Sequence, residues 1–322
     1  MPLVTVVVSI FNGSRFIEGF AEYFGQQEFK DTEVIFVVDS KTTDDTVKKI
    51  ERMKSTIPES TILMQNDNLG LGGSRNIGLD AAKGKYVWFV DVDDRPYPDF
   101  LSTMVKLAED NEADVSICNF VKSFDLNTKV PDKKYTVKIM SREEVMLDLI
   151  KDKIPVVIWS KLMKVDFLRK KNLKFSSGYI EDVDYTYRML SECSKAVYCS
   201  KPLYLYHQNP TSFCASSNNE RGRTEVKAYG KLFGTLDSGN LKNMVQRRCV
   251  VMMMRSSVHM DYATYTEYIK SKEFRDVADK HLRNPLSPEY VCVRVLPSLY
   301  YIGLQFYLKF FYGREKRYYN KY

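Results

Sequence analysis

The stretch Tyr86–Asp94, YVWFVDVDD, decides the fold and points to the site. Its first half is an uncharged run of aromatic and β-branched residues, which predicts a buried strand. The run then meets three carboxylates, Asp91, Asp93 and Asp94. Ionised carboxylates at the end of a buried strand need a partner, and a divalent cation carrying a phosphorylated ligand fits that need. Alone, the motif also fits a polar loop with its acids in water.

The first 120 residues around this stretch alternate between strand and helix signals. Strands are predicted at Leu3–Phe11, Glu33–Ser40, Thr61–Gln65, Tyr86–Val92 and Asp114–Phe120, and helices at Arg15–Gln27, Thr42–Lys54, Gly72–Ala82 and Pro98–Asn111. Such alternation predicts an α/β fold with βαβ units and a mostly parallel sheet flanked by helices. Right-handed crossovers would bring the strand ends to one edge.

Later signals are mixed and then become helical. Ser141 and Glu144 form a capping box that opens a helix to about Lys151. After a loop or hairpin at Lys122–Lys138, helices are expected at Lys161–Asn172 and Asp182–Glu192, with strands at Ala196–Cys199 and Leu203–Tyr206. Strand signals fade after about residue 216, so we expect one domain at 1–215 and a helical C-terminal region at 216–322.

Composition excludes several classes of function. The net charge of +7 suits a polyanionic ligand or an anionic membrane without demonstrating either. No block of five like charges occurs, so we expect no nucleic acid as a partner. The six cysteines form no CxxC pair and the three histidines lie far apart, which favours a reduced, cytoplasmic protein without a histidine-based zinc site. We expect a first strand at the N-terminus and no signal peptide.

Asp39 ends the second predicted strand as Asp91 ends the fourth. Ends of neighbouring parallel strands share a crevice, where ligands bind in open α/β sheets. Asp39 can therefore accept hydrogen bonds from a base or a ribose. A turn-forming aspartate fits the same position.

A glycine cluster precedes the third predicted helix in the segment NLGLGGSRNIG, Asn68–Gly78. The dinucleotide-binding fingerprint would follow the first strand, where this chain has FNGS. We expect instead a loop whose glycines, Gly72 among them, let the backbone approach a ligand, with Arg75 supplying a guanidinium. A surface charge, or a salt bridge from Arg75 to an aspartate of the DVDD run, is the alternative.

Glu181 and Asp182 open a helix, where carboxylates complement the macrodipole. The alternative is a general base that takes a proton from an attacking hydroxyl. Position does not decide between them. Three further residues are, by themselves, more typical of ordinary roles than of a site. Trp159 is typical of a core tryptophan, Lys161 of a solvated lysine and His207 of a structural histidine.

The order of the motifs carries more information than each motif alone. Across residues 2–215 the chain contains, in sequence, VVVSIFNGSRFI, EVIFVVDS, NLGLGGSRNIGLDAAKGKYVWFVDVDD, VIWSKLMKVDFLRKKNLKF, GYIEDVDYTYRML and YLYHQNPTSF. This succession resembles the family 2 glycosyltransferases of GT-A fold, of the bacterial polysaccharide and glycoconjugate type. The resemblance implies a nucleotide-sugar-binding half at 1–120 and an acceptor-binding half at 121–215.

The resemblance also implies roles for matching positions. Ser9 would neighbour the nucleotide, and Asp39 would read the uracil ring. Asp91 and Asp93 match the DxD-type motif that holds the ribose and a Mn²⁺ or Mg²⁺ ion, and Asp182 matches the catalytic base. Gly72 and Arg75 belong to the same donor site. Weaker assignments to the donor or acceptor pocket are Asp94, Trp159, Lys161, Glu181 and His207.

The implied reaction moves a sugar from a nucleoside-diphosphate sugar, with UDP expected, to a hydroxyl of a saccharide or a lipid-linked saccharide. Inversion is the family's expectation. Alternatives are a nucleotidyltransferase of related α/β fold and a non-catalytic sugar-binding or scaffold subunit. The sequence does not fix the oligomeric state.

The last segment, 295–322, is aromatic and apolar, then basic. It is too short and too interrupted to span a membrane. Two interpretations are equally weighted: an interfacial helix on the inner face of the cell membrane, or a helix docked on the catalytic core or another subunit.

Overall fold

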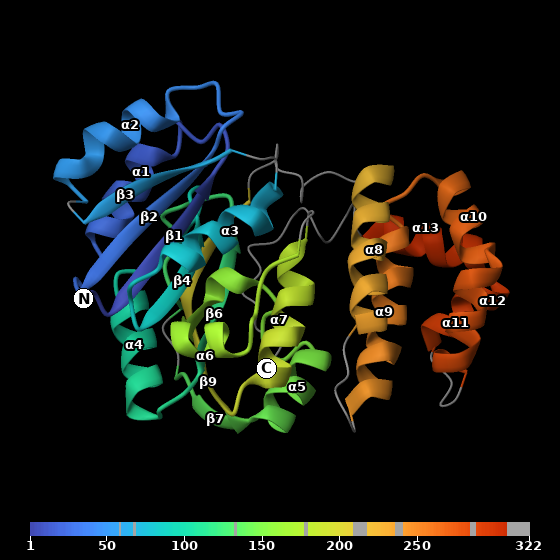
Figure 1. Cartoon of the computed structure of the whole chain (residues 1–322). Helices are drawn as coiled ribbons and strands as arrows, with labels where there is room; N and C mark the ends of the chain where they lie inside the picture. The colour runs from blue at the N-terminus through green and yellow to red at the C-terminus, as the bar shows by residue number, and fades with distance from the viewer. Residues whose placement is uncertain are drawn as a thin grey trace. The chain divides into compact units, whose positions relative to one another are not determined.

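The structure, a computed structural model, describes residues 1–57, 59–66, 69–131, 134–176, 180–208, 218–235, 241–283 and 288–307. Met1–His207 forms one compact unit, and a second begins at Gln208. Figure 1 shows a sheet with flanking helices in the first unit and helices in the second. The expected boundary after residue 215 lies outside the described residues.

A nine-stranded sheet organises the first unit, in the order β3-β2-β1-β4-β8-β6-β9-β5, with β7 pairing to β9. The strands are β1 Val4–Ile10, β2 Thr32–Asp39, β3 Ser60–Gln65, β4 Tyr86–Asp91, β5 Arg95–Pro96, β6 Val115–Ser123, β7 Val137–Ser141, β8 Lys161–Lys164 and β9 Lys195–His207. The first four are mutually parallel, as the sequence predicted. The remainder mixes parallel and antiparallel pairs, so the sheet as a whole is mixed.

Helices cover both faces of this sheet (Figure 1). They are α1 Ile17–Gly25, α2 Thr46–Arg52, α3 Gly70–Ala81, α4 Phe100–Asp110, α5 Arg142–Ile150, α6 Val165–Lys170 and α7 Glu181–Glu192, with the 3-10 helices η1 Met53–Ser55 and η2 Ile158–Ser160. Phe20, Ile50 and Phe100 of α1, α2 and α4 pack in one core with alternate residues of β1, β2 and β4. Helix α3 lies on the opposite face, where a Cβ at Gly78 would overlap Val7.

Strand register places the first site residues side by side. Ser9 of β1 is in register with Val37 of β2 and with Asp91 of β4. Successive side chains of a strand point to opposite faces. Val8 and Val90 belong to the core under α1, α2 and α4. Ser9 and Asp91 therefore face the side that α3 covers.

The predicted helix at 161–172 is wrong in its first third. Residues 161–164 form β8, which is inserted antiparallel between β4 and β6, with Leu162 in register with Trp88 and Ser116. Only Val165–Lys170 is helical. A short apolar run fits a strand and a buried helix equally well, and here sheet pairing decides.

One smaller difference concerns β9, whereas the predicted capping box is present. The two strands predicted at 196–199 and 203–206 are one strand, Lys195–His207, with an irregularity in its pairing near Asn119. The capping box is confirmed, because Ser141 and Glu144 satisfy each other's backbone N–H groups at the start of α5.

The second unit is helical where described, as expected. Its helices are α8 Asn219–Thr235, α9 Lys242–Ser257, α10 Tyr262–Lys270, α11 Lys272–Leu282, α12 Pro288–Val295 and α13 Pro297–Tyr307. They enclose a separate apolar core that includes Val250, Met254, Tyr265 and Leu282. Of the described helices, none combines the length and apolarity that crossing a membrane requires.

Candidate active site

Arg75 of α3 is the centre of the site. Its Nη2 lies 3.1 Å from Asp91 Oδ1 at the end of β4, and its Nη1 forms an ion pair with Glu181 at the start of α7. The guanidinium also lies over the ring of Phe175, 5.5 Å from its centroid. Only 4% of the Arg75 side chain is exposed. The salt bridge from Arg75 to an aspartate of the DVDD run, one of the alternatives to ligand binding, is present. Arg75 also pairs with a second acid, Glu181.

The residues beside Arg75 connect α3 to further segments. Ser74 Oγ donates a hydrogen bond to the Gln65 side chain at the end of β3. Asn76 bonds both backbone groups of Phe175: its Nδ2 donates to the carbonyl at 2.9 Å, and its Oδ1 accepts from the N–H at 2.8 Å. The sequence did not assign roles to Ser74, Asn76 or Gln65. The run Ser74-Arg75-Asn76, three adjacent polar residues within α3, is the signal that could have found the first two.

Gly72 lies within the first turn of α3, because that helix begins at Gly70 and not at Gly72. A Cβ on Gly72 would overlap the carbonyl oxygen of Ser176 and lie 3.2 Å from Phe175 Cβ. The missing side chain thus lets α3 approach the segment that leads to α7. Its contact with a ligand stays a prediction.

The ends of the neighbouring strands β2, β1 and β4 lie where the sequence predicts the donor site, and β1 and β2 contribute Ser9 and Asp39. Ser9 Oγ is buried and finds no hydrogen-bond partner within the described residues. Asp39, which follows core residue Val38, faces the same side as Ser9, and its Oδ1 accepts a hydrogen bond from the Lys41 N–H at 2.8 Å. An unsatisfied buried hydroxyl costs free energy unless something binds it, which favours a ligand here.

The loops that follow β1 and β2 hold each other in place. Asn12, with a left-handed φ of 47°, accepts the Thr43 N–H at 2.9 Å through Oδ1. The Ser14 N–H donates to Asp44 Oδ2 at 3.0 Å. Burial opposes ionisation of Asp44, but hydrogen bonds from Thr46 and Ser14 together outweigh it and lower the pKa of Asp44 to about 2. The sequence did not identify this connection, which shapes the rim beside Asp39.

The acids of the site are crowded. Burial, and then the charge of Asp91, raise the pKa of Asp93 to about 6. Burial raises the pKa of Glu181 to about 7, although Arg75 opposes the shift. Burial also raises the pKa of Asp182, with Arg75 opposing and Asp91 adding to the rise. The positive charges of Arg75, Lys161 and Arg15 oppose these shifts without cancelling them, so further positive charge would favour the ionised acids.

A divalent cation fits the donor set of Asp91 and Asp93. The described residues contain no ready-made group of three metal-ligating side chains. Mg²⁺ does not need one, because it is usually held by one or two carboxylates with phosphates and water completing its shell. Asp91 keeps 29% of its side chain exposed despite its salt bridge. Oxygen ligands of this kind suit Mg²⁺ and Mn²⁺.

Asp94 turns away from this group into the fold. It is 2% exposed and accepts hydrogen bonds from the Tyr204 hydroxyl at 2.9 Å and the His207 N–H at 2.8 Å. Burial raises its pKa well above the ordinary value. This geometry favours a role in fixing the end of β9 beside the DVDD loop. The imidazole Nδ1 of His207 is buried without a partner among the described residues.

Trp159 and Lys161 are both deeply buried. The Trp159 ring stacks on Tyr204 and Tyr206, at centroid distances of 4.4 and 5.6 Å. Lys161 Nζ donates to the carbonyls of Pro155, at 2.7 Å, and Val157, at 2.6 Å. Burial lowers the Lys161 pKa to about 7. Both side chains support the segment around η2, and their contact with substrate stays a prediction.

Helix α7 begins at an unusual backbone conformation. Its N-cap, Ile180, has a φ of 64°, which is a rare value for a β-branched residue. Such strain is retained only where surrounding structure demands it. Glu181 and Asp182 follow directly and so start the helix next to Arg75.

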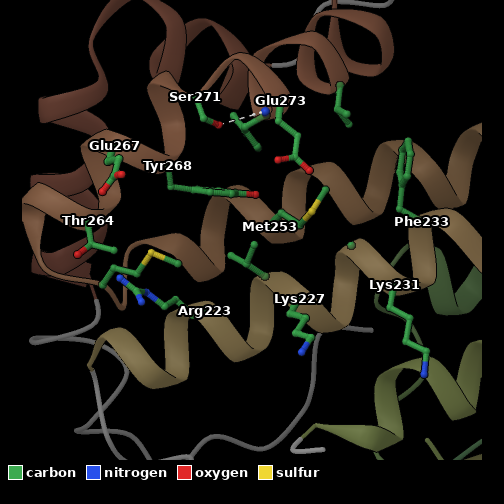
Figure 2. A pocket seen from close by; sticks show the side chains of 15 residues that line it. Arg223, Lys227, Lys231, Phe233, Met253, Thr264, Glu267, Tyr268, Ser271 and Glu273 are labelled. Carbon is green, nitrogen blue, oxygen red and sulfur yellow. Dashed lines mark hydrogen bonds between the residues drawn. The ribbon is translucent and has the colours of Figure 1, made fainter.

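The second unit contains a cavity of about 880 Å³ among α8 to α11 (Figure 2). Met253, Tyr268 and Phe274 contribute apolar surface, and Figure 2 shows the ammonium ends of Lys227 and Lys231 directed away from Tyr268. None of the site residues expected from the sequence lines it. The cavity is therefore separate from the site predicted at Asp91.

A sequence profile described as Glycosyl transferase family 2 matches residues 5–170, over half of the chain. The chain belongs to this family. Its matched region contains the strand ends, Arg75 and the DVDD run. Asp182 and the rest of α7 lie beyond it.

Similarity to individual proteins agrees with this membership. The uncharacterized glycosyltransferase EpsJ of Bacillus subtilis is 27% identical over 224 residues, which cover 66% of this chain and 63% of that relative. The chain thus spans under two thirds of this relative's length.

Solved structures show the fold. TarS 1-349 of S. aureus in complex with UDP has a TM-score of 0.66 at 17% identity, covering 98% of this chain and 93% of its own. Mannosyltransferase PcManGT from Pyrobaculum calidifontis, in complex with GDP-Man and Mn²⁺, has a TM-score of 0.60 at 16% identity, covering 96% and 87%. The predicted GT-A fold is confirmed by these likenesses.

Replacing Arg75 with Met should leave Asp91 and Glu181 without their shared cation. We expect a loss of about 3–5 kcal/mol in the free energy of unfolding, measured by urea denaturation. Adding Glu181→Gln to Arg75→Met should recover part of that loss, because one buried charge is removed. Losses that simply add in the double variant would contradict the coupling.

Replacing Gly72 with Ala should destabilise the protein by about 1–3 kcal/mol, because the new methyl group meets the Ser176 carbonyl. Gly19→Ala in α1 is the matched control, since its nearest neighbour would be 3.9 Å away and alanine favours helix. Urea denaturation of both variants is the measurement. Equal stability of the two would argue against tight packing at Gly72.

Proposed function

We propose that the chain transfers a sugar from a nucleoside-diphosphate sugar, with UDP as the expected nucleotide, to an acceptor hydroxyl. The observation that carries the proposal is the bridge from Asp91 through Arg75 to Glu181. It joins the strand end suited to a donor to the helix that carries Asp182. Family membership supports the reaction class.

On this proposal the donor binds at the ends of β1, β2 and β4. Ser9 and Asp39 would contact the nucleoside, since one offers an unsatisfied hydroxyl and the other a carboxylate at the rim. Asp91 and Asp93 would hold a Mn²⁺ or Mg²⁺ ion. Such an ion stabilises the charge that builds on the leaving diphosphate. The Mn²⁺ in the PcManGT complex supports a metal, and the UDP in the TarS complex supports the nucleotide.

Asp182 would act as the general base. The acceptor oxygen attacks the anomeric carbon, the bond from that carbon to the diphosphate breaks, and Asp182 takes the hydroxyl proton. A pKa raised by burial makes a carboxylate a better proton acceptor, which supports this role. A single displacement of this kind inverts the anomeric centre.

The acceptor would bind in the half at 121–215, near Trp159 and His207, while 1–120 would bind the donor. The class of the acceptor remains a prediction from the sequence. It would be a saccharide or a lipid-linked saccharide of cell-surface polysaccharide or glycoconjugate synthesis. A cytoplasmic location at the inner face of the membrane also remains a prediction.

Replacing Asp182 with Asn should reduce transfer by about 10²–10⁴-fold, since the base is lost. Donor affinity should stay within about twofold of the parent protein, because the exchange removes no donor contact. Turnover and donor binding by calorimetry are the two measurements. Parallel loss of both would assign Asp182 a structural role.

Thermal-shift titration with UDP, GDP, CMP and their sugars, each with and without Mn²⁺, tests the donor site directly. We expect UDP compounds to stabilise the protein, and more so with Mn²⁺. Asp93→Ala should remove the metal-dependent part of the shift. Asp110→Ala, an exposed aspartate of α4, is the control and should retain it.

Two outcomes would contradict the proposal. Stabilisation by nucleoside triphosphates alone, with diphosphate release, would favour a nucleotidyltransferase. Sugar binding without transfer or hydrolysis of any donor would favour a non-catalytic subunit.

A further inference from the structure

Lys161 is a fully buried lysine at the start of β8. Its Nζ donates hydrogen bonds to the carbonyls of Pro155, at 2.7 Å, and Val157, at 2.6 Å, and lies 3.5 Å from Ser160 Oγ. These partners are two carbonyls and a hydroxyl, none of which carries a charge. A buried ammonium with such partners gains from a negative charge nearby, because burial removes the water that would otherwise stabilise it.

The backbone that Lys161 binds also packs against α7. The carbonyl of Val156, between the two that accept from Lys161, accepts a hydrogen bond from Thr186 Oγ1 at 2.6 Å. Thr186 follows Asp182 by four residues in α7, so the two side chains lie on one face of the helix. The face of α7 that carries Asp182 therefore meets residues 155–157, the segment that also binds the Lys161 ammonium.

The charges of Lys161 and Asp182 act on each other. Burial lowers the pKa of Lys161, and the negative charge of Asp182, followed by Cys118, opposes that fall. Burial raises the pKa of Asp182, and the positive charge of Lys161 is among the influences that oppose the rise. Asp182 is half-buried whereas Lys161 has no exposed surface, so the carboxylate can reach a substrate and the ammonium cannot.

The other charged groups around Asp182 are committed to one another. They are Arg75 of α3, Asp91 of β4 and the adjacent Glu181. Arg75 forms ion pairs with both Asp91 and Glu181, so its charge is shared between two acids. The hydrogen bonds of Lys161, by contrast, go to uncharged groups.

We infer that Lys161 is a positioning residue for Asp182: it fixes the backbone of 155–157 beside α7 and supplies a buried positive charge that favours the Asp182 carboxylate over the neutral acid. The inference rests on the proposed function, in which Asp182 takes the proton of the acceptor hydroxyl. A base must be unprotonated to do so. Lys161 would thus keep the base available at lower pH without touching the substrate.

The pH profile of kcat/KM tests this role in two neutral variants. Lys161→Gln keeps N–H donors for the carbonyls, and Lys161→Met removes donors and charge together. Without the ammonium the pKa of Asp182 should rise, so the acidic limb of the profile should move to higher pH by about half a unit or more in both variants. Lys161→Arg retains the charge and should keep the limb close to that of the parent protein.

Two control variants separate charge from structure. Lys164→Met removes a positive charge at the other end of β8 and should leave the limb in place. Thr186→Val removes the hydrogen bond to the Val156 carbonyl without changing any charge, so it should lower turnover with the limb unmoved. Lys161 variants that lose turnover but keep the parent limb, as expected of Thr186→Val, would overturn the inference.

The converse measurement needs no activity. Lysine labelled with ¹³C at Cε reports the ionisation of Lys161 by NMR, and loss of a signal in Lys161→Arg identifies it. We expect Lys161 to titrate at lower pH in Asp182→Asn than in the parent protein, because the negative charge that favours the ammonium is gone. Equal midpoints would overturn the inference, even where the neutral Lys161 variants fail to fold. Absence of transfer by the parent, with this NMR shift present, would contradict the proposed function and not the coupling of the two charges.

Discussion

The architecture of the site depends on one buried guanidinium. Arg75 binds Asp91 and Glu181, two acids that lie far apart in the sequence and belong to different elements. A buried charge needs full compensation, and Arg75 obtains it only when β4 and the start of α7 are both in place. The same contact prevents two acids from facing each other unpaired. The strand end and the helix of Asp182 are thereby held beside one another.

The surroundings of Arg75 explain why this arrangement is reproducible. Gly72 lets α3 approach the segment before α7, and Asn76 binds both backbone groups of Phe175. The close approach at Gly72 determines how far α3 lies from the segment before α7. The hydrogen bonds of Asn76 determine how the two segments are aligned. Asp93 and Asp182 have raised pKa values because burial and like charge disfavour ionisation more than nearby cations favour it. An incoming cation and a hydroxyl proton would relieve that crowding.

Much of the fold could be predicted because its first half has strong local signals. Continuous apolar runs mark β1, β2 and β4, and turn residues separate them. The prediction failed at 161–164, where a four-residue run pairs as β8 between β4 and β6. Nothing within that run distinguishes a strand from a buried helix; the partners on either side decide. For the same reason Lys161, which sequence alone treats as solvated or pocket-lining, is buried against carbonyl groups.

The sequence by itself determined the fold class, the acids at the strand ends and the family, because each rests on local order: apolar runs, and motifs in a characteristic succession. Only the tertiary structure decided which acids act together. It directs Asp94 inward to Tyr204 and His207, while Asp91 meets Arg75 and Glu181. Adjacent residues can serve opposite purposes because side-chain direction and burial depend on the packing of distant segments, and no local pattern encodes that packing.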